Sequence, residues 1–228
     1  MKFLKYLLIA LLVICVDQTS KLLVYAHMQL GDEINVIGTW FRLHYLLNPG
    51  MAFGIRWENE FGKLALTVFR IGAMVAIGYY LYSSVKKNLH VGFLICLALI
   101  LGGAVGNVID STFYGVFLDN NALGMPTKWF HGEVIDMLYF PLFHFTVPEW
   151  FPLNPGGEFE FFSPVFNIAD SSIFIGVVTI LIFQKRFFPH PAKEDSPGET
   201  LEMNQEEPHT TSDISVTETT ASTETQPD

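Results

Sequence analysis

Four long stretches of the chain are apolar nearly throughout, and more polar segments separate them. The stretches are Phe3–Tyr25, Leu64–Tyr82, Val91–Ile109 and Val165–Phe183. A run of about 18 or more apolar residues can cross the hydrocarbon core of a bilayer as a helix. The pattern therefore predicts a mainly α-helical integral membrane protein with four transmembrane helices.

The first stretch also has features of a cleavable signal peptide. Lys2 and Lys5 precede the apolar residues, and Val24-Tyr25-Ala26 resembles a cleavage site. However, Asp17 and Lys21 interrupt the stretch, and three further spans follow. We therefore interpret it as a retained first helix.

Two long connections, residues 26–63 and 110–164, join the predicted spans. In the first, Phe41, Leu43, Tyr45 and Leu47 alternate with other residues, which predicts a strand in a small β-sheet. In the second, residues 137–165 form an aromatic segment broken by prolines, which suits a membrane interface but cannot span it. Anchoring and contact with a lipid-bearing substrate both remain open as its role.

Basic residues near the ends of the spans predict the orientation. They form three clusters, Lys2 with Lys5, Lys86 with Lys87, and Lys185 with Arg186. All three clusters lie on one side if the helices alternate in direction, and cytoplasmic loops carry an excess of lysine and arginine. We therefore expect both termini to be cytoplasmic, with the sheet and the aromatic segment on the outer, periplasmic side.

The composition indicates a membrane domain followed by a polar tail. Half of the residues are apolar, and the mean hydropathy is +0.34. Most of the net charge of −10 comes from residues 191–228, which hold ten acidic residues and one lysine. This segment has too few large apolar residues to form a core. We expect a four-helix membrane domain over residues 1–189 and a disordered acidic cytoplasmic tail over residues 190–228.

Charged side chains inside apolar spans are costly, so they are candidates for function. Asp17 and Lys21 are four residues apart, and they can pair on one face of the first helix. We expect a structural pair, with Lys21 extending outward to the interface. Contact with one end of a substrate is the alternative. Arg70, a little inside the second span, is expected to extend to the outer headgroups.

Amides and carboxylates gather at the outer ends of the later spans. In chain order they are Asn107, Asp110, Asp136 and Asp170. Two carboxylates that meet at one depth share a proton, because like charges so close cannot both ionise. One carboxylate can then accept a proton from water while the other donates one.

Structural explanations exist for some of the same positions. Gly102 and Gly106 form a small-residue pair that allows close helix packing. Either Ser163-Pro164 or Asn167 can cap the fourth helix. With Asn167 as the cap, Asp170 takes the capping-box position and could serve only to satisfy backbone donors.

No other group of residues offers an equal centre for catalysis. The loop histidines His27, His44, His131 and His144 lack metal-ligand spacing. Cys15 and Cys96 lie inside apolar runs, where we expect packing residues. We expect no metal, no cofactor and no nucleic-acid partner.

Five short motifs occur in order along the chain. They are "DQTSK" in the first span, "NPGMAFG" after the strands, "GGAVGNVID" closing the third span, "VID" before the aromatic segment and "FNIAD" opening the fourth span. Over residues 1 to about 188, this ordered set resembles lipoprotein signal peptidase (signal peptidase II), the bacterial membrane aspartyl peptidase. The resemblance implies an inner-membrane enzyme that cuts diacylglyceryl-modified prolipoproteins just before the lipidated cysteine.

The resemblance also implies roles for particular residues. Asp136 and Asp170 match the catalytic pair. The positions that hold the pair, the substrate or the fold are Asp17, Lys21, Asn48, Gly50, Asn107, Asp110 and Asn167. Two features depart from the family pattern: Ser111 stands where an arginine is common, and the interval between Asp136 and Asp170 is long. The implied partners are prolipoproteins and membrane lipids, and we expect a monomer with its active site toward the outer leaflet.

Two other classes of protein were weighed against this interpretation. A small proton-coupled transporter also uses charged residues within the membrane, but it normally places them near the midplane in repeated or broken helices. A scaffold would explain the glycines but not the aspartates. The outer position of the carboxylates favours the peptidase.

Overall fold

The computed structural model describes residues 2–50, 60–121, 127–141, 143–146, 149–150, 156, 158–161 and 164–188. The chain divides into two units, Met1–His190 and Pro191–Asp228, and every described residue belongs to the first. The predicted disordered tail and parts of the aromatic segment lie outside the described residues, and the expected roles of both stay predictions.

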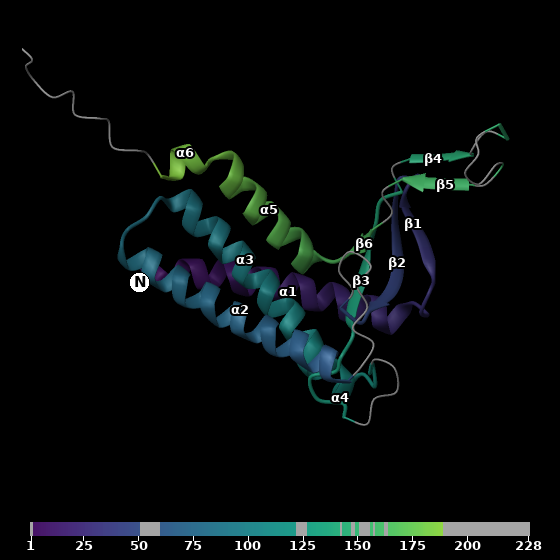
Figure 1. The fold of residues 1–228 in the computed structure, drawn as a ribbon, viewed down its shortest axis with the longest axis horizontal. Helices are drawn as coiled ribbons and strands as arrows, with labels where there is room; N and C mark the ends of the chain where they lie inside the picture. The colour runs from purple at the N-terminus through teal and green to yellow at the C-terminus, as the bar shows by residue number, and fades with distance from the viewer. Residues whose placement is uncertain are drawn as a thin grey trace, which may run out of the picture. The chain divides into compact units, whose positions relative to one another are not determined.

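Most of the described residues are helical (Figure 1). The helices are α1 (Lys2–His27), α2 (Glu60–Lys86), α3 (Val91–Ile109), α4 (Gly115–Phe117), α5 (Ile168–Ile182) and α6 (Gln184–Phe187). A π-helical turn, η1 (Asp110–Tyr114), joins α3 to α4. The start of α1, the end of α2 and α6 lie at one end of the bundle, and the strands lie at the other (Figure 1).

Three helical segments are long and apolar enough to cross a membrane, namely Lys2–His27, Phe61–Lys86 and Val91–Phe117. The third of them comprises α3, η1 and α4. The fourth predicted span is shorter than expected. Its first residues, Val165–Phe166, form strand β6, and the helix begins only after Asn167. The 15 residues of α5 rise about 22 Å, less than the roughly 30 Å of a bilayer core. The predicted start of this span was therefore wrong, and its crossing of the membrane stays a prediction.

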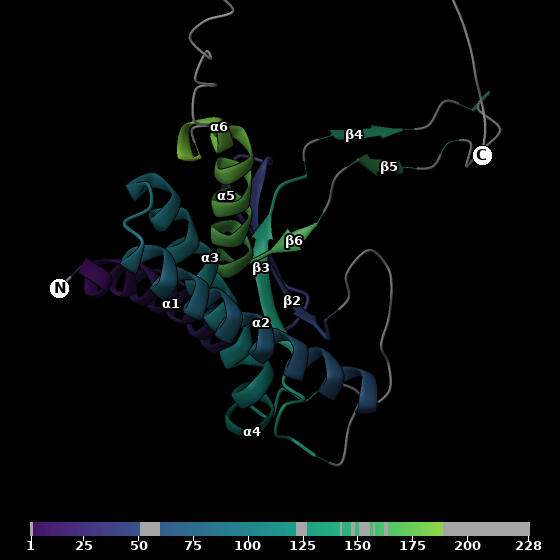
Figure 2. The same cartoon turned by 60° about the vertical axis from the view of Figure 1, so that its left-hand side comes forward.

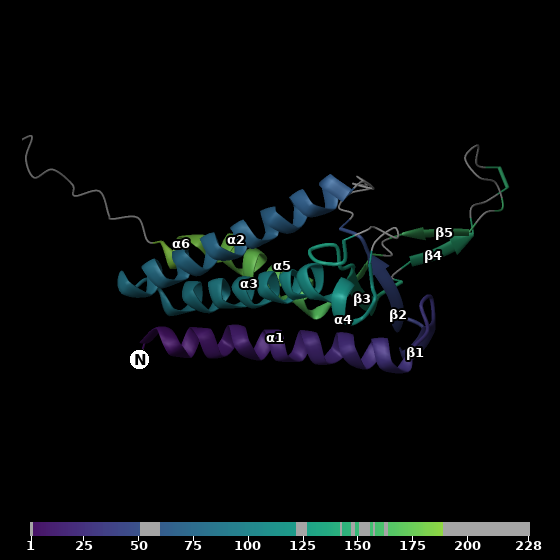
Figure 3. The same ribbon diagram turned by 90° about the horizontal axis from the view of Figure 1, so that it is seen from below.

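Helix α3 lies between α1 and α2, with α5 packed alongside it (Figure 3). Glycines permit this close packing, as the small-residue pair predicted. A Cβ atom at Gly102 would lie 2.9 Å from the carbonyl oxygen of Ala10, and one at Gly106 would lie 2.6 Å from Asp17 Oδ2. Neither position has room for a side chain unless α1 moves away.

The strands form two antiparallel sheets (Figure 2). The larger sheet has the order β1 (Glu33–Ile37), β2 (Phe41–Asn48), β3 (Val134–Tyr139) and β6. The smaller one pairs β4 (Phe143–Thr146) with β5 (Glu158–Phe161). Strand β2 confirms the strand predicted from the alternation of Phe41 to Leu47. In the larger sheet, Asp136 of β3 stands opposite Leu46 of β2.

Buried apolar side chains form two clusters in the bundle. One includes Tyr6, Leu81 and Phe93, and the other joins the end of α1 to the sheet through Val24 and Ile135. The outer faces of the helices carry many exposed apolar side chains, as expected for helices in contact with lipid.

Both cysteines are free thiols. Cys96 is buried in the first of these clusters, as its place in an apolar run predicted. Cys15 lies exposed on α1, so the packing role expected for it was wrong.

Candidate active site

Lys21 is the centre of a buried ionic cluster. Its Nζ lies 2.8 Å from Asp17 Oδ2 and 2.7 Å from Asp110 Oδ2, and all three side chains are fully buried. The expectation that Lys21 extends to the membrane interface was therefore wrong, although its pairing with Asp17 is confirmed. The reason is tertiary: η1, which follows α3, brings Asp110 against α1, and this second carboxylate holds the ammonium inside.

Gln18 completes the hydrogen bonding of this cluster, and the sequence analysis missed it. Its Nε2 donates to Asp110 Oδ1 at 2.8 Å, to Asp17 Oδ2 at 3.1 Å and to the Gly106 carbonyl at 3.2 Å. Its Oε1 accepts a 3.0 Å hydrogen bond from the Tyr114 hydroxyl. The available signal was its position beside Asp17 in an apolar helix, where a polar side chain needs partners.

Asp17 ties α1 to the first turn of α5. Its Oδ1 accepts a 2.8 Å hydrogen bond from the backbone N–H of Ala169. That group is one of the N–H donors without an intrahelical acceptor at a helix start, and a carboxylate there also interacts favourably with the helix dipole. The contact fixes the backbone immediately before Asp170.

Asp136 lies on β3 with 3% of its surface exposed. Its Oδ1 accepts a 2.7 Å hydrogen bond from Asn167 Nδ2, and its Oδ2 accepts a 3.0 Å bond from Asn48 Nδ2. Burial, and after it the negative charge of Asp170, raise the pKa of Asp136 to about 7 against the opposing effect of the two amides. Asp136 therefore holds a proton far more readily than an ordinary aspartate does.

Gly50 orients the Asn48 amide toward Asp136. The backbone N–H of Gly50 donates to Asn48 Oδ1 at 2.8 Å, which leaves Nδ2 to face the carboxylate. Gly50 has a φ of 102°, a conformation that favours glycine. The backbone of this turn therefore sets the direction of the Asn48 amide.

Asp170 lies in the first turn of α5 and is less buried than Asp136. Its Oδ1 accepts a 2.7 Å hydrogen bond from Asn107 Nδ2. Lys21 Nζ lies 3.2 Å from Asn107 Oδ1, so the lysine fixes which end of that amide faces Asp170. Electrostatic interaction between Asp170 and Asp136 contributes to the raised pKa of Asp136.

Asn167 joins the two carboxylates. It caps α5, because its Oδ1 accepts a 2.9 Å hydrogen bond from the Asp170 backbone N–H, while its Nδ2 donates to Asp136. Of the two caps that the sequence left open, Asn167 is therefore confirmed. Among the described residues, the Asp170 carboxylate makes no return bond to the Asn167 backbone and instead accepts from Asn107, so backbone capping does not account for it.

A polar stripe on α2 faces the same region. Lys63, Thr67 and Arg70 are spaced i, i+4 and i+7, so they share one face of the helix. Lys63 Nζ donates to the Pro49 carbonyl at 2.8 Å, and Thr67 Oγ1 donates to the Phe130 carbonyl at 2.8 Å. The sequence analysis missed Lys63 and Thr67, although this spacing was the signal that could have found them.

Arg70 points inward rather than to the headgroups, so that expectation was also wrong. Its Nη1 donates to the buried Ser111 Oγ at 2.7 Å. Its Nη2 lies beside Gly50, 3.7 Å from where a Cβ atom there would stand. The guanidinium interacts electrostatically with the carboxylates of Asp170, Asp110 and Asp136.

One continuous set of contacts thus connects all nine candidate residues predicted from the sequence. They are Asp17, Lys21, Asn48, Gly50, Asn107, Asp110, Asp136, Asn167 and Asp170. They come from α1, the β2 end, α3, η1, β3 and α5. Long apolar helices around such a polar centre define an integral membrane protein with the groups needed for acid–base chemistry.

Solved structures support this class. The chain is similar to a bacterial membrane enzyme determined by the in meso method at 2.3 Å, with a TM-score of 0.55 and 26% identity. The alignment covers 83% of this chain and 93% of that one.

The Signal peptidase (SPase) II family matches residues 9–186, and the chain belongs to this family. It is therefore a bacterial membrane peptidase that removes signal peptides, and the resemblance seen in the sequence is confirmed. A lipoprotein signal peptidase of Amoebophilus asiaticus is 42% identical over 210 residues, which cover 89% of each chain. One from Porphyromonas gingivalis is 45% identical over 185 residues, covering 77% of this chain and 80% of the relative.

Proposed function

We propose that this peptidase cuts diacylglyceryl-modified prolipoproteins just before the lipidated cysteine, using Asp136 and Asp170 as an aspartic acid–base pair. The names of the relatives support the substrate. The observation that carries the mechanism is the shared asparagine: Asn167 caps the helix of Asp170 and donates to Asp136. One side chain thereby sets the position of both carboxylates.

The unequal surroundings of the two carboxylates divide the roles. Asp136 is nearly fully buried and has a pKa of about 7, so it is the member that holds the shared proton. Asp170 is more exposed, and within the described residues its Oδ2 accepts no hydrogen bond. Asp170 is therefore the group that meets water.

The reaction follows from this division. Asp170 takes a proton from a water molecule as the water oxygen attacks the scissile carbonyl, and Asp136 gives its proton to the carbonyl oxygen. The C–N bond of the tetrahedral intermediate then breaks. Asp170 returns its proton to the leaving amine, and Asp136 recovers a proton from the hydroxyl that becomes the carbonyl of the new acid. One water is consumed, and both carboxylates end as they began.

The ionic cluster acts as support for this pair. Asp17 holds the backbone at Ala169, next to Asp170, and Lys21 orients Asn107 toward the Asp170 carboxylate. Arg70 adds a positive charge from α2, which favours the ionised form of the pair. We assign these residues positioning and electrostatic roles rather than proton transfer.

The proposed orientation places this centre toward the outer leaflet of the inner membrane. The start of α1, the end of α2 and α6 carry the basic clusters and lie at the end of the bundle remote from the carboxylates (Figure 1). An excess of lysine and arginine marks the cytoplasmic side. Both termini are then cytoplasmic, membrane lipids surround the helices, and the protein acts as a monomer. A reporter fused at Lys87 should read as cytoplasmic and one near Gly31 as external; the reverse would overturn this orientation.

A defined precursor tests the substrate and the bond that is cut. The purified protein would be incubated with a synthetic precursor peptide bearing a diacylglyceryl cysteine, and with the same peptide lacking the lipid. Mass spectrometry should show one cut, immediately before the cysteine, in the lipidated peptide only. Equal cleavage of both peptides, or a cut at another bond, would contradict the proposal.

A further inference from the structure

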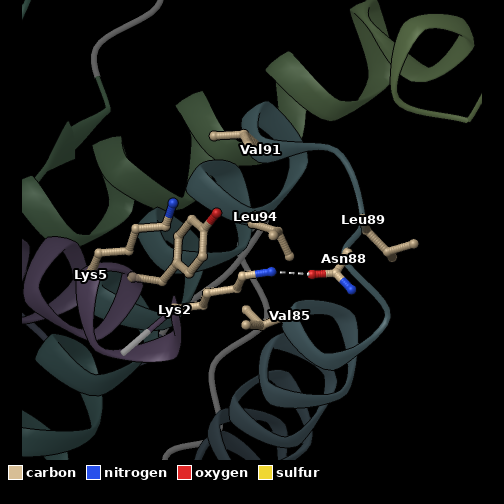
Figure 4. A pocket seen from close by; sticks show the side chains of 8 residues that line it. Lys2, Lys5, Val85, Asn88, Leu89, Val91 and Leu94 are labelled. Carbon is tan, nitrogen blue, oxygen red and sulfur yellow. Dashed lines mark hydrogen bonds between the residues drawn. The ribbon is translucent and has the colours of Figure 1, made fainter.

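A pocket of about 190 Å³ lies beside the start of α1 and the turn between α2 and α3 (Figure 4). This end of the bundle is remote from the strands and from the start of α5, which carry the two carboxylates (Figure 1). The pocket wall includes Lys2, Lys5 and Tyr6 of α1, Asn88 of the α2–α3 turn, and Val91 and Leu94 of the first turn of α3. Two segments far apart in the sequence, residues 2–6 and 85–94, thus meet around one opening. The peptidase chemistry uses none of these residues.

The charged residues that line the pocket are both lysines. Lys2 Nζ donates to Asn88 Oδ1 at 2.9 Å, and Lys5 Nζ stands 4.9 Å from the centre of the Tyr6 ring. Within the part of the chain that the structure describes, neither lysine has a carboxylate partner. Two ammonium groups without a counter-charge make this pocket attractive to an anion.

Tyr6 provides a polar atom inside the same pocket. The residue is 3% exposed, and among the described residues its hydroxyl has no hydrogen-bond partner. The hydroxyl oxygen is not fully enclosed by protein atoms, so it can be reached from the pocket. A nearly buried hydroxyl normally has a partner, because burying it without one is costly. An acceptor atom of a bound ligand would meet that need.

The start of α3 adds a favourable electrostatic field. Val91 and Leu94 place the first turn of this 19-residue helix on the pocket wall. A helix N-terminus carries a partial positive charge and binds phosphate readily. Asn88 has a structural explanation of its own, because its positive φ of 51° ends α2 in the left-handed conformation.

We propose that this pocket binds the phosphate group of an anionic phospholipid. The lysines and the Tyr6 hydroxyl supply the donors that an oxyanion requires, and the dipole of α3 adds a favourable field, although His90 caps this helix and accepts from the Gly92 N–H. The lipid is favoured over free phosphate because exposed apolar side chains, including Leu4 at 58% and Leu8 at 55%, continue from this end along α1 and can contact acyl chains. Basic pockets between transmembrane helices are suited to acidic lipid headgroups. The inference is independent of the catalytic mechanism.

Native mass spectrometry of the full-length protein in neutral detergent tests the site. Phosphatidylglycerol should bind with one tight equivalent and phosphatidylcholine more weakly, because the second headgroup carries a balancing positive charge. Lys2→Gln and Lys5→Gln should each weaken phosphatidylglycerol binding about fivefold. Tyr6→Phe, which removes only the hydroxyl, should weaken it by about threefold. The matched control is Lys87→Gln, which removes a lysine at the same end of the bundle but outside the pocket wall, and should leave the tight equivalent unchanged.

Two results would overturn the proposal. If Lys87→Gln weakens binding as much as Lys5→Gln, the lipid responds to the general charge of this surface and not to the pocket. If inorganic phosphate competes with phosphatidylglycerol at equal concentration, the ligand is free phosphate and not a lipid. Lys5 is exposed on α1, so the Lys5→Gln result stands even if Tyr6→Phe fails to fold.

Discussion

The two ends of the helical bundle hold α3 by opposite means. Near its start, Phe93 and Leu97 pack with Tyr6 and Leu81 in an apolar cluster. Near its end, Asn107 and Asp110 contact α1 and α5 through hydrogen bonds and ion pairs of 2.7 to 3.2 Å. Close apolar packing stabilises a helix pair directly through many small contacts.

Buried charges behave differently, because removing them from water costs about as much as their mutual attraction returns. Replacing such a cluster with apolar side chains is often neutral or stabilising. The polar end is therefore poorly explained by stability alone, and its contacts converge on Asp136 and Asp170. In the proposed mechanism, the apolar end stabilises the bundle and the polar end positions the catalytic carboxylates.

The largest effect on activity is expected at the polar end, at the two carboxylates of the proposed catalytic pair. Asp136→Asn or Asp170→Asn keeps the size and hydrogen bonding of the side chain but removes the transferable proton, so either should lower kcat about a thousandfold. Asp110→Asn is the matched control, because it changes a buried carboxylate that belongs to the supporting cluster. Cleavage of the lipidated precursor would be measured with each correctly inserted variant. Substantial activity in Asp136→Asn would move the catalytic role to Asp110.

Lys21 tests how the polar end responds when its charge balance is broken. Lys21→Met leaves Asp17 and Asp110 buried without a counter-charge and should destabilise the fold by about 3–5 kcal/mol. Adding Asp110→Asn should recover part of the loss, because it removes one unpaired charge. Thermal unfolding in detergent would compare both with Leu81→Ala at the apolar end, where about 2–5 kcal/mol is lost. Leu81→Ala should show no such rescue by Asp110→Asn, and equal rescue in both backgrounds would refute the ionic explanation.

Arg70 should have an intermediate effect on activity. Arg70→Gln removes the positive charge and should lower kcat about tenfold with little change in KM, because the charge favours the ionised pair. Arg70→Lys keeps the charge and should recover much of that loss. Ser111→Ala, which removes only the 2.7 Å hydrogen bond, should be milder than Arg70→Gln. A loss confined to thermal stability would mean that Arg70 is structural.

The smallest expected effect is a shift of the alkaline limb in the profile of activity against pH. Burial and the charge of Asp170 raise the pKa of Asp136 to about 7, so its proton is retained up to near-neutral pH and lost above it. Activity should therefore fall as the pH rises through about 7, with an apparent value that belongs to the pair. The Asn48 amide lowers this pKa, so Asn48→Ala should move the alkaline limb to higher pH. A limb that stays in place or moves down would contradict the assignment of Asp136 as the acid.

The sequence predicted the elements better than the directions of their side chains. Apolar runs predicted α1, α2 and α3, and alternation predicted β2, because these patterns depend only on local periodicity. The pairing of Lys21 with Asp17 was also local. The burial of Lys21 and the inward direction of Arg70 depend on Asp110 and Ser111, which arrive from η1 only when the chain has folded.

The start of α5 also differs between the sequence prediction and the structure. Val165 and Phe166 read as part of an apolar run, but they pair with β3, and the cap at Asn167 sets the true start of the helix. Hydropathy cannot separate an apolar strand from the beginning of an apolar helix. The carboxylates and the amides of Asn48, Asn107 and Asn167 could be anticipated from the sequence motifs, whereas the contacts that connect them required the fold.

The central claim is that Asp136 and Asp170 act as one unit, and a double-mutant cycle tests it most directly. The rate of cleavage of the lipidated precursor would be measured for Asp136→Asn, Asp170→Asn and the double variant, each shown to be inserted and folded. A pair that shares one proton and one mechanism should lose nearly all activity with the first substitution, so the double variant should be about as slow as either single one. Losses that multiply, with the double variant slower by the product of both single effects, would show two independent contributions and contradict the account.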